Sequence, residues 1–575
     1  MNKVERREKL EFNLRRFIRF LRQLVSNGKA IFGLTIIIFF CILALFPHLF
    51  TPNTPLGRDP ETNGPVARKF AAPAWLRYVP PSLGGNPDLT ENLRIINDPG
   101  LPRLDYEGGE LRIQTNYPQL ISAAVDQEVG FPFAEPFPRY EEKNGSLAVT
   151  FERSAGETYG EVRVYILKDF VYPFTGLAAG FMANIEILVS GTTHPYLGED
   201  YLDVPLKVRV FIKAKEGKEW SLWPPPYNEE TKFYNVKDAL VGFDINYTTG
   251  EPLILRPYSG RAASAHWIIS RPSVASGATF ISDAKLSRLT MGIPVTDDPV
   301  SYIFTKRPGN YTFGVELTFI DKDFPEKRVR TQVHIDNMFF EIIGNSYGIM
   351  GTDQNGYDLF AQLIYGTRIS LYLGLSVSVF SILIGLIVGL AAGYLGGVAD
   401  QLLMRFNDLM LCLPTLPLLI VLAAVLGHTL ENLMIIMIFL GWNGFARVVR
   451  SMTLSLKERP FVEAARAVGA GTGHIITRHI IPNVMSVVYV SLATSVPGVV
   501  TAEAALSWLG FYDPTRMSWG RMLHNLSWIG GAAQALVNPL WPILPGLFIA
   551  LLASSFILLG YALDEVLNPK LRIRR

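Results

Sequence analysis

Six predominantly apolar stretches of this chain are long enough, or nearly so, to cross a membrane as helices. A hydrocarbon core needs roughly 17–25 apolar residues of helix. We predict transmembrane helices at residues 30–50, 369–395, 405–426, 432–449, 484–505 and 539–563. These stretches are apolar on all sides, which is not the pattern of surface helices in a globular domain. The fold class that follows is an α-helical membrane protein with six transmembrane helices.

A different pattern fills the block 51–350, between the first two predicted helices. Apolar and polar residues alternate there with period two, bounded by Gly, Pro and Asp, as in strands with one solvated face. The clearest strands are residues 161–168, 205–213, 311–320 and 328–335. We therefore expect a β-rich domain, with a β-sandwich as its architecture, inserted between helices 1 and 2. The Pro-rich residues 51–100 predict an irregular lead-in.

These patterns divide the chain into four parts. Residues 1–29 form a basic tail and 30–50 the first helix, 51–350 is the insertion, and 351–575 is a core with helices 2–6 and a polar loop at 450–483. A signal peptide is the alternative interpretation of the N-terminal stretch. The long basic head, without a small-x-small cleavage site after the apolar run, counts against it.

Composition separates the same parts. The chain is 49% hydrophobic and 18% charged, with a mean hydropathy of +0.23, which argues against a soluble multidomain enzyme and against disorder. The net charge of +2 gives no sign of nucleic-acid binding. Residues 51–350 hold 30 basic and 37 acidic residues. An acidic block is therefore joined to a basic membrane part.

The positions of Lys and Arg predict the orientation in the membrane. Cytoplasmic loops are enriched in these residues. Basic clusters precede the first helix, follow the last one, and fill the loop 447–482 between helices 4 and 5. Since six crossings return the chain to its starting side, we expect a multi-pass plasma- or inner-membrane protein. Both termini and this loop would be cytoplasmic, and residues 51–350 extracellular or periplasmic.

No catalytic or metal site is predicted in the insertion. His194, His266 and His334 are isolated, and neither of the two cysteines, Cys41 and Cys412, lies in it. Packing rather than disulfide bonds must therefore stabilise it. The aromatic run 220–227 could stack on sugars, although ordinary packing is the simpler explanation. Glycosylation sequons occur at Asn144, Asn246, Asn310 and Asn525.

The loop 450–483 predicts two short helices. Residues 460–468 begin with Pro460, which suits a first helical turn, and end before three glycines at 469, 471 and 473. A second helix is expected over 474–481, stopped by Pro482. Phe461, Ala464, Ala465 and Val468 share one small apolar face. Such a knob could sit in a partner's groove, or it could be an ordinary connector between helices.

The residues of this loop resemble a known family. Glu463-Ala464-Ala465, Gly469 and Ile481-Pro482 are similar in spacing to the E-A-A…G…P loop of ABC-importer permeases. Residues 351–371, 504–510, 518–520 and 545–560 resemble motifs of the C-type dipeptide and oligopeptide permeases. The motif residues before helix 2 are Gly351, Thr352, Asp353, Gly356, Asp358 and Arg368. The chain departs from the family at Tyr357, where the family has Arg, and in the length of the insertion.

The resemblance implies a type I importer with a MetI-like core. Two permeases, this one and a related partner, would line a pathway, driven by two cytoplasmic ATPases and fed by an external binding protein. The ATPase-coupling residues would be Glu463, Ala464, Ala465, Arg466, Gly469 and Pro482. The permease itself would be no enzyme and would bind no cofactor, because ATP and Mg²⁺ belong to the ATPases. In keeping with this, the sequence has no G-x-x-x-x-G-K-[ST] motif.

The predicted helices carry few features beyond apolar residues. Gly385, Gly389 and Gly393 recur every four residues, a spacing that allows helices to pack closely. Pro414, Pro417 and Pro497 are expected to kink helices 3 and 5. Glu503 and the nearby Ser507 are the candidates for a pathway or gate, with a snorkelling interfacial Glu503 as the alternative.

Di- and oligopeptides are the expected substrates, and oligosaccharides or nickel are the alternatives within the same transporter type. A secondary transporter would need ion-relaying charges inside its helices, and these are scarce. A membrane-anchored extracellular binding protein, enzyme or adhesin would need only one helix. We further expect the insertion to be a docking scaffold for the binding protein.

Overall fold

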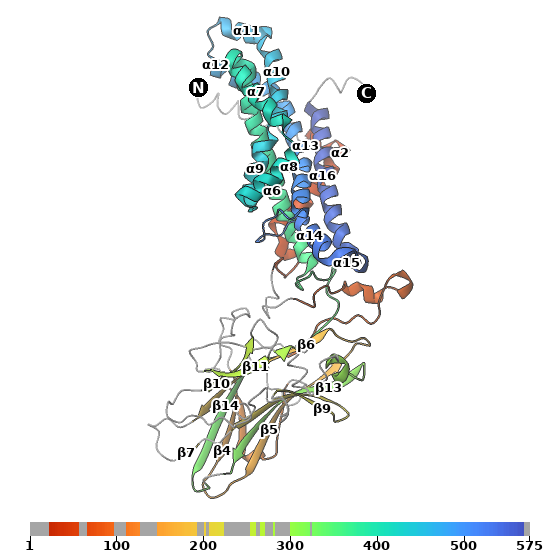
Figure 1. The fold of residues 1–575 in the computed structure, drawn as a ribbon, viewed down its shortest axis with the longest axis vertical. Helices are drawn as coiled ribbons and strands as arrows, with labels where there is room; N and C mark the ends of the chain where they lie inside the picture. The colour runs from red at the N-terminus through yellow and green to blue at the C-terminus, as the bar shows by residue number, and fades with distance from the viewer. Residues whose placement is uncertain are drawn as a thin grey trace. The chain divides into compact units, whose positions relative to one another are not determined.

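The computed structural model describes residues 22–56, 66–96, 111–126, 146–191, 201–202, 206–223, 253–259, 265–270, 280–281, 299–322 and 325–567. The chain forms two compact units. One, Met1–Leu56 with Asp358–Arg575, is helical; the other, Gly57–Tyr357, is built from β-strands (Figure 1). The predicted sequons Asn144 and Asn246, His194 and residues 1–21 of the basic tail lie outside the described residues.

The helical unit consists mainly of long apolar helices. Its principal helices are α2 Gly28–Leu45, α6 Leu359–Leu395, α7 Gly397–Cys412, α8 Thr415–Leu426, α9 Leu430–Gly441, α10 Asn443–Lys457, α13 Ile481–Trp508 and α16 Leu540–Leu567. Shorter helices are α11 Pro460–Ala467, α12 Thr472–Ile475, α14 Trp519–Asn525 and α15 Gly531–Val537. Among the described residues, five helical segments could cross a membrane, or six if the bent pair α7–α8 counts as one span.

The second spanning helix starts ten residues before its predicted start at 369. The charge of Arg368 suggested a boundary, but α6 runs through it from Leu359. The guanidinium lies on the surface and its Nε donates a hydrogen bond to the Ala44 carbonyl oxygen at 2.8 Å, in the last turn of α2. Because a long side chain can reach a polar partner from an apolar helix, one Arg does not end the span.

The third predicted helix, 405–426, is two helices rather than one kinked helix. α7 and α8 meet at an angle of 88°, with Pro414 at the N-terminal cap of α8 and Pro417 in its first turn. Proline has no N–H to continue a helical ladder, so α7 ends at Cys412 and a new helix begins beyond Pro414. Pro497, in contrast, lies inside α13, which continues to Trp508.

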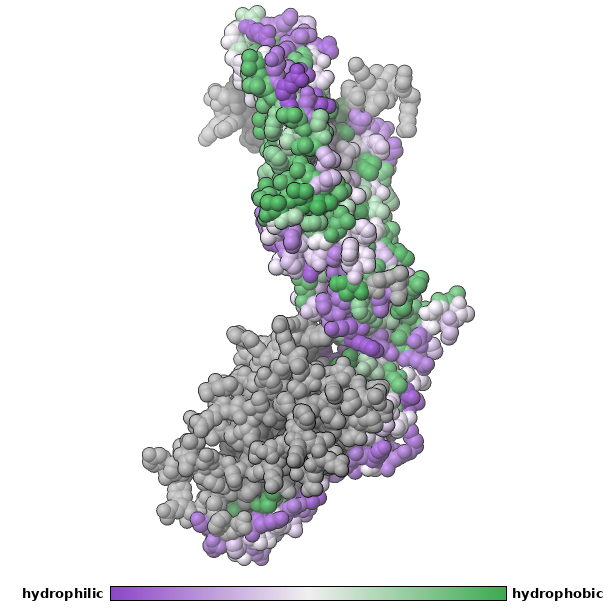
Figure 2. Space-filling model, in the orientation of Figure 1, coloured by the Kyte–Doolittle hydropathy of each residue, from purple (hydrophilic) through white to green (hydrophobic). Residues whose placement is uncertain are grey.

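Glycines of α6 allow α10 to pack directly on its backbone. A Cβ atom at Gly385 would lie 2.8 Å from the Trp442 carbonyl oxygen, and one at Gly389 would lie 2.5 Å from that of Ala446. A Cβ atom at Gly393 would likewise come too close to Arg450 and Thr453 of α10. The every-fourth-residue glycines therefore serve helix packing. Exposed apolar side chains gather along the middle of the unit, and polar ones at the end formed by α11 and α12 (Figure 2).

The β unit contains two packed sheets. The larger sheet has the order β11-β10-β6-β14-β4-β3, with β1 and β7 also paired to β14 and β12 to β6; the smaller has the order β2-β5-β13-β8-β9. The strands of the larger sheet are β1 Leu93–Ile96, β3 Ile121–Asp126, β4 Ser146–Arg153, β6 Gly180–Gly191, β7 Tyr201–Leu202, β10 Leu253–Ser259, β11 Ala265–Ser270, β12 Phe280–Ile281 and β14 Arg328–Ile343. Those of the smaller sheet are β2 Arg112–Thr115, β5 Gly160–Tyr172, β8 Leu206–Ala214, β9 Glu219–Trp223 and β13 Gly309–Asp321.

One hydrophobic core joins the two sheets. Phe151 of β4 stacks on Phe319 of β13 with ring centroids 5.3 Å apart, and Phe313 of β13 stacks on Phe340 of β14 at 4.6 Å. The four strands predicted from alternation are all present, and their inward apolar residues are buried wherever burial is described. This arrangement is the β-sandwich expected from the period-two pattern.

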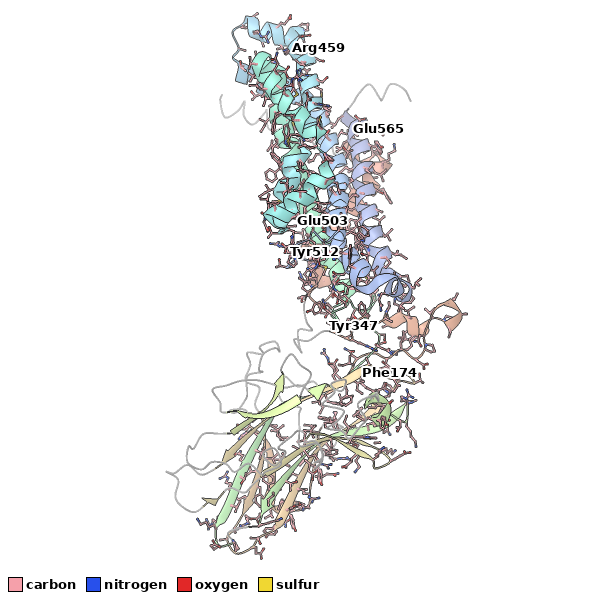
Figure 3. The ribbon with its side chains drawn as sticks, in the orientation of Figure 1. Phe174, Tyr347, Arg459, Glu503, Tyr512 and Glu565 are labelled. Atoms are coloured by element: carbon pink, nitrogen blue, oxygen red, sulfur yellow. The ribbon has the colours of Figure 1, made fainter. Side chains whose placement is uncertain are left out.

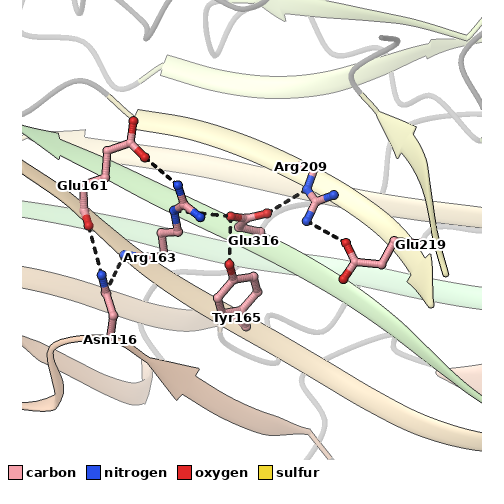
Figure 4. Close-up of polar contacts among 7 residues, drawn as sticks. All are labelled: Asn116, Glu161, Arg163, Tyr165, Arg209, Glu219 and Glu316. Carbon is pink, nitrogen blue, oxygen red and sulfur yellow. Dashed lines mark hydrogen bonds and ion pairs between the residues drawn. The ribbon is translucent and has the colours of Figure 1, made fainter. Parts of the chain in front are cut away.

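The outward face of the smaller sheet carries a row of polar contacts (Figure 4). Glu316 accepts hydrogen bonds from Arg209 Nε at 2.7 Å and from the Tyr165 hydroxyl at 3.1 Å, and Arg209 also pairs with Glu219. A partly exposed pair such as Arg209–Glu219 contributes little stability, about 0–1 kcal/mol. The sandwich therefore depends chiefly on its apolar core.

A buried histidine makes the stability of the sandwich depend on pH. His334 of β14 is buried, its Nδ1 lies 2.9 Å from the Ser146 hydroxyl, and the Asp126 carboxylate is 4.0 Å away. Burial lowers the pKa of His334, although the Asp126 charge opposes this effect. The folded state therefore binds fewer protons than the unfolded state, whose His titrates near 6.5.

Lowering the pH from 7.5 to 5.5 should therefore destabilise the sandwich by up to about 1.4 kcal/mol per pH unit once the unfolded His begins to protonate. The measurement is hydrogen exchange of peptides from β4 and β14 in the full-length protein, corrected for intrinsic rates. His334→Gln, which cannot gain this proton, serves as the comparison. An equal pH response in both proteins would contradict the role given to His334.

Candidate functional site

The hairpin of α11 and α12 is held on the helical unit by a small apolar cluster. Val462 of α11, Ile475 of α12 and Ile480 are buried, together with Leu390 of α6 and Val449 of α10. The hairpin is therefore packed against three of the long helices, because Val484 of α13 belongs to the same cluster. A displacement of the hairpin would therefore disturb its packing against all three helices.

The opposite side of α11 is open. Phe461 is 43% exposed and Val468 88% exposed, while Glu463, Ala464 and Arg466 are also exposed. Of the apolar face expected from the sequence, Ala465 alone is partly buried and packs on the cluster, and the other three residues point outward. Large exposed apolar side chains next to small ones leave room for another molecule to approach this surface closely.

Gly469 makes the turn after α11. Its φ is +84°, a conformation that costs residues with a Cβ roughly 1 kcal/mol or more. The turn is closed by hydrogen bonds from the N–H of Gly469 to the Arg466 carbonyl and from that of Ala470 to the Ala465 carbonyl, each 3.0 Å long. The break predicted at Gly469 is therefore present, as a compact helix C-terminus.

The sequence predicted that the second helix of the hairpin stops at Pro482, and this prediction is wrong. Instead α12 passes through a π-helical turn, Ile476–Ile480, into α13, and Pro482 occupies the first turn of α13. Asn483 Nδ2 donates a hydrogen bond to the His479 carbonyl oxygen at 2.6 Å. Pro482 thus lies inside a continuous helix, where a proline removes one N–H donor, and the π-helical turn directly precedes it. The hairpin is thus continuous with a spanning helix.

Two ion pairs that the sequence analysis missed connect the bent pair to α10. Arg450 of α10 donates two hydrogen bonds, at 2.5 and 2.6 Å, to the carboxylate of Asp400 on α7. Arg447 pairs with Asp408 of α7 at 2.6 Å. No sequence signal distinguished these residues from other basic residues of the loop, because their partners lie about forty to fifty positions away.

The motif before the second spanning helix falls into turn and cap positions. Gly351 and Gly356 have φ of +73° and +84°. The Thr352 hydroxyl accepts a hydrogen bond from the N–H of Ala71 at 2.8 Å, and Asp353 Oδ1 accepts from the N–H groups of Asn355 and Tyr357. These residues shape the chain as it leaves the β unit.

Asp358 and Arg368 belong to the helical unit. Asp358 caps α6, with Oδ1 accepting from the Phe360 N–H and Oδ2 from Asn53 Nδ2, each at 2.9 Å. Arg368 reaches the last turn of α2. Asp358 therefore ties α6 to the segment that follows α2, and Arg368 ties it to α2 itself, which are structural roles.

Glu503 and Ser507 lie side by side on α13, inside the protein. Ser507 donates a hydrogen bond to Glu503 Oε1 at 2.7 Å, and only 5% of Glu503 is exposed. The backbone of α14 covers them, since a Cβ atom at Gly520 would lie 2.7 Å from atoms of Ala504 and Ser507. Glu503 is therefore not a snorkelling surface residue. Its burial depends on a helix that the sequence pattern did not place.

The candidate residues form two separate places rather than one site. Glu503 is about 31 Å along α13 from Pro482, at 1.5 Å per residue. Figure 3 shows Arg459, at the start of the hairpin, far from Glu503 in the helical unit. In the part of the chain that the structure describes, no group of three His, Cys, Asp or Glu side chains could hold a metal ion.

Comparison with known proteins identifies the helical parts. Residues 381–573 match the family "Binding-protein-dependent transport system inner membrane component", and residues 16–73 match "N-terminal TM domain of oligopeptide transport permease C". The oligopeptide transport system permease protein OppC of Haemophilus influenzae is 40% identical over 228 residues, which are 39% of this chain and 71% of that protein. The dipeptide permease DppC of Bacillus subtilis is 36% identical over 39% of this chain and 68% of its own length.

Among solved structures, an inward-facing MetNI methionine ABC transporter is similar, with a TM-score of 0.28 and 19% identity. The match covers 35% of this chain and 96% of that one. A TM-score this low says nothing further about the fold, so the family assignment rests on the sequence matches.

Proposed function

This chain belongs to the oligopeptide and dipeptide permeases of ABC importers, and from that premise we propose that it forms half of a peptide pathway driven through the α11–α12 hairpin. As a permease of that family it is a multi-pass membrane transport component and not an enzyme, and it works with ATPase partners. We further propose where those partners bind and on which side of the membrane each part lies.

The observation that carries the proposal is the two-sided hairpin. One side, with Val462 and Ile475, is buried against the spanning helices, and the other, with Phe461, Ala464 and Val468, is exposed. An exposed, partly apolar surface on a firmly anchored element suits a partner that must push or pull it. We assign the coupling role to Glu463, Ala464, Ala465, Arg466 and Gly469, with Pro482 in the first turn of the connected helix.

The orientation we propose places the hairpin in the cytoplasm. The start of α2 and the end of α16 lie together, since Asn27 Nδ2 donates a hydrogen bond to Glu565 Oε2 at 3.1 Å. Gly560, near the same end of α16, packs on Thr494 in the first half of α13, which begins at the hairpin. Both termini and the hairpin would then share one side, where the basic residues gather. Residues 51–350 would be outside.

The remaining partners follow from the family. We propose a second, related permease as the other half of the pathway, two ATPases that bind ATP and Mg²⁺, and an external binding protein that docks on the inserted domain. Di- or oligopeptides are the proposed substrates, because the relatives named above are oligopeptide and dipeptide permeases. Glu503 and Ser507, buried at the other end of α13, are the proposed gate residues.

Ala464→Arg tests the coupling role. It adds a long charged side chain to the exposed face without touching the buried cluster. We expect the permease to fold normally while uptake and its stimulation of ATP hydrolysis fall at least about tenfold, which is about 1.4 kcal/mol of lost coupling. The measurement is both rates in proteoliposomes with the partner subunits.

Asp564→Arg is the matched control, because it places the same new side chain on the exposed end of α16. It should retain both rates. Parental uptake and ATPase stimulation in Ala464→Arg would refute the coupling role but would leave the family assignment intact.

A further inference from the structure

The β unit carries a compact loop whose apolar side chains face solvent. Two 3₁₀ helices, Ala74–Tyr78 and Pro81–Leu83, form this loop. It is closed by hydrogen bonds from the N–H of Asn86 to the Leu76 carbonyl at 3.0 Å and from that of Gly85 to the Pro80 carbonyl at 3.2 Å. The backbone therefore holds a defined shape, as in an Ω-loop packed by its own atoms.

The loop is also fixed to the rest of its unit. Trp75 Nε1 donates a hydrogen bond to the Ile349 carbonyl oxygen at 2.9 Å. Arg77 donates from Nε to the Leu89 carbonyl and from Nη2 to Glu91, each at 3.0 Å. The polar group of Trp75 and the only charge between residues 74 and 87 are thus bound internally. What the loop offers to its surroundings is mainly apolar.

Four side chains make up this surface, which we call the apolar tip. Tyr78 is 78% exposed, Leu83 76%, Ile349 54% and Trp75 39%. Pro80 and Pro81, which lie between Tyr78 and Leu83, restrict the backbone of the loop. Burying such exposed apolar side chains against an apolar environment is favourable, by about 25 cal/mol per Å² buried.

Only a short segment of chain connects the apolar tip to α6. Residues 70–72 pair with residues 345–353, so both connections to the spanning helices leave the β unit beside this loop. Ile349 is nine residues before Asp358, the cap of α6. At about 3.5 Å per residue, this connection spans at most roughly 32 Å.

We propose that the apolar tip inserts into the interfacial layer of the lipid bilayer and holds the inserted domain at the membrane surface. Trp, Tyr and Leu without free charges are the residues that settle at the boundary between headgroups and acyl chains. Arg77, the charged residue within 74–87, is held by Leu89 and Glu91, so the side chains that the tip presents are apolar. The inference holds whichever side of the membrane the domain lies on, and it needs no partner subunit.

Spin labels on single cysteines test this insertion. Leu83→Cys is made in a Cys41→Ser, Cys412→Ser background and placed in phosphatidylcholine nanodiscs. Collision with O₂ and with a water-soluble nickel chelate then reports depth. We expect the label at 83 to collide several-fold less with the chelate, and more with O₂, than a label at a solvated position of similar exposure.

Val171→Cys supplies that position, since Val171 is 58% exposed on β5. Neither substitution removes a buried side chain, so both proteins should fold, and Tyr78→Cys repeats the test at a second residue of the tip. Equal access of the chelate to labels at 78, 83 and 171 would overturn the proposal. Protection that appears only when a binding protein is added would overturn it as well, because the tip would then be a protein-docking surface.

Discussion

Replacing Asp321 with alanine is expected to destabilise the β-sandwich by about 3–5 kcal/mol, the cost of leaving one partner of a buried ion pair without the other. Arg153 and Asp321 are almost completely inaccessible, and Arg153 Nε lies 2.9 and 2.8 Å from the two carboxylate oxygens. Asp321 Oδ2 also accepts from the Tyr159 N–H at 3.0 Å. Alanine removes every one of these acceptors while the guanidinium stays inside.

The urea midpoint of the inserted domain, measured by pulse proteolysis of the full-length protein in nanodiscs, reports this loss. Glu161→Ala is the control, because it breaks the exposed pair with Arg163 and should cost about 1 kcal/mol or less. The double change Arg153→Met with Asp321→Leu should recover much of the loss, since it removes both charges. A shift for Asp321→Ala no larger than that for Glu161→Ala would show that the buried pair is not needed.

Gly389→Leu is expected to separate α6 from α10 and to cost about 3 kcal/mol, the upper end of the usual range for overpacking. A Cβ atom alone would lie 2.5 Å from the Ala446 carbonyl oxygen and 2.7 Å from Val449 Cβ. Carbonyl oxygens on a helix cannot move aside as side chains do. Since α10 leads into the hairpin, the displacement should also disturb the cluster around Val462.

Size-exclusion profiles and thermal unfolding of the purified permease are the measurements, with a lower yield of monodisperse protein and a lower midpoint as the expected result. Gly444→Leu is the matched control on α10, because a Cβ atom there meets nothing within 4 Å. It should behave like the parent protein. Equal losses in both variants would mean that leucine at a helical glycine, rather than close packing of α6 on α10, causes the effect.

The strands were predictable from sequence because their signal is local. Val315, Leu317 and Phe319 alternate with polar residues, and all three are completely buried. The pairing of β13 with β5 and β8 was not predictable, because those strands are about a hundred residues or more away in the chain and no alternation encodes a partner.

The helical unit was harder to predict from sequence where a residue type is compatible with two environments. An arginine such as Arg368 can mark the end of a span or lie on the surface of one. Arg368 lies on the surface of α6 because its Nε donates a hydrogen bond to the Ala44 carbonyl oxygen. A glutamate such as Glu503 can face water or the interior. Glu503 is buried because α14 covers it. Within α11, Phe461 and Val462 are both apolar, so pattern alone could not say that Val462 packs inward while Phe461 stays exposed.

The π-helical turn between α12 and α13 has a mechanical consequence. From Thr472 to Trp508 the backbone is one helical rod of 37 residues, about 55 Å long. A flexible linker would absorb a displacement of its end, whereas a continuous helix passes part of it on along its length. A shift at the hairpin would thus be transmitted along α13 toward Glu503 and Ser507 rather than lost in a loop.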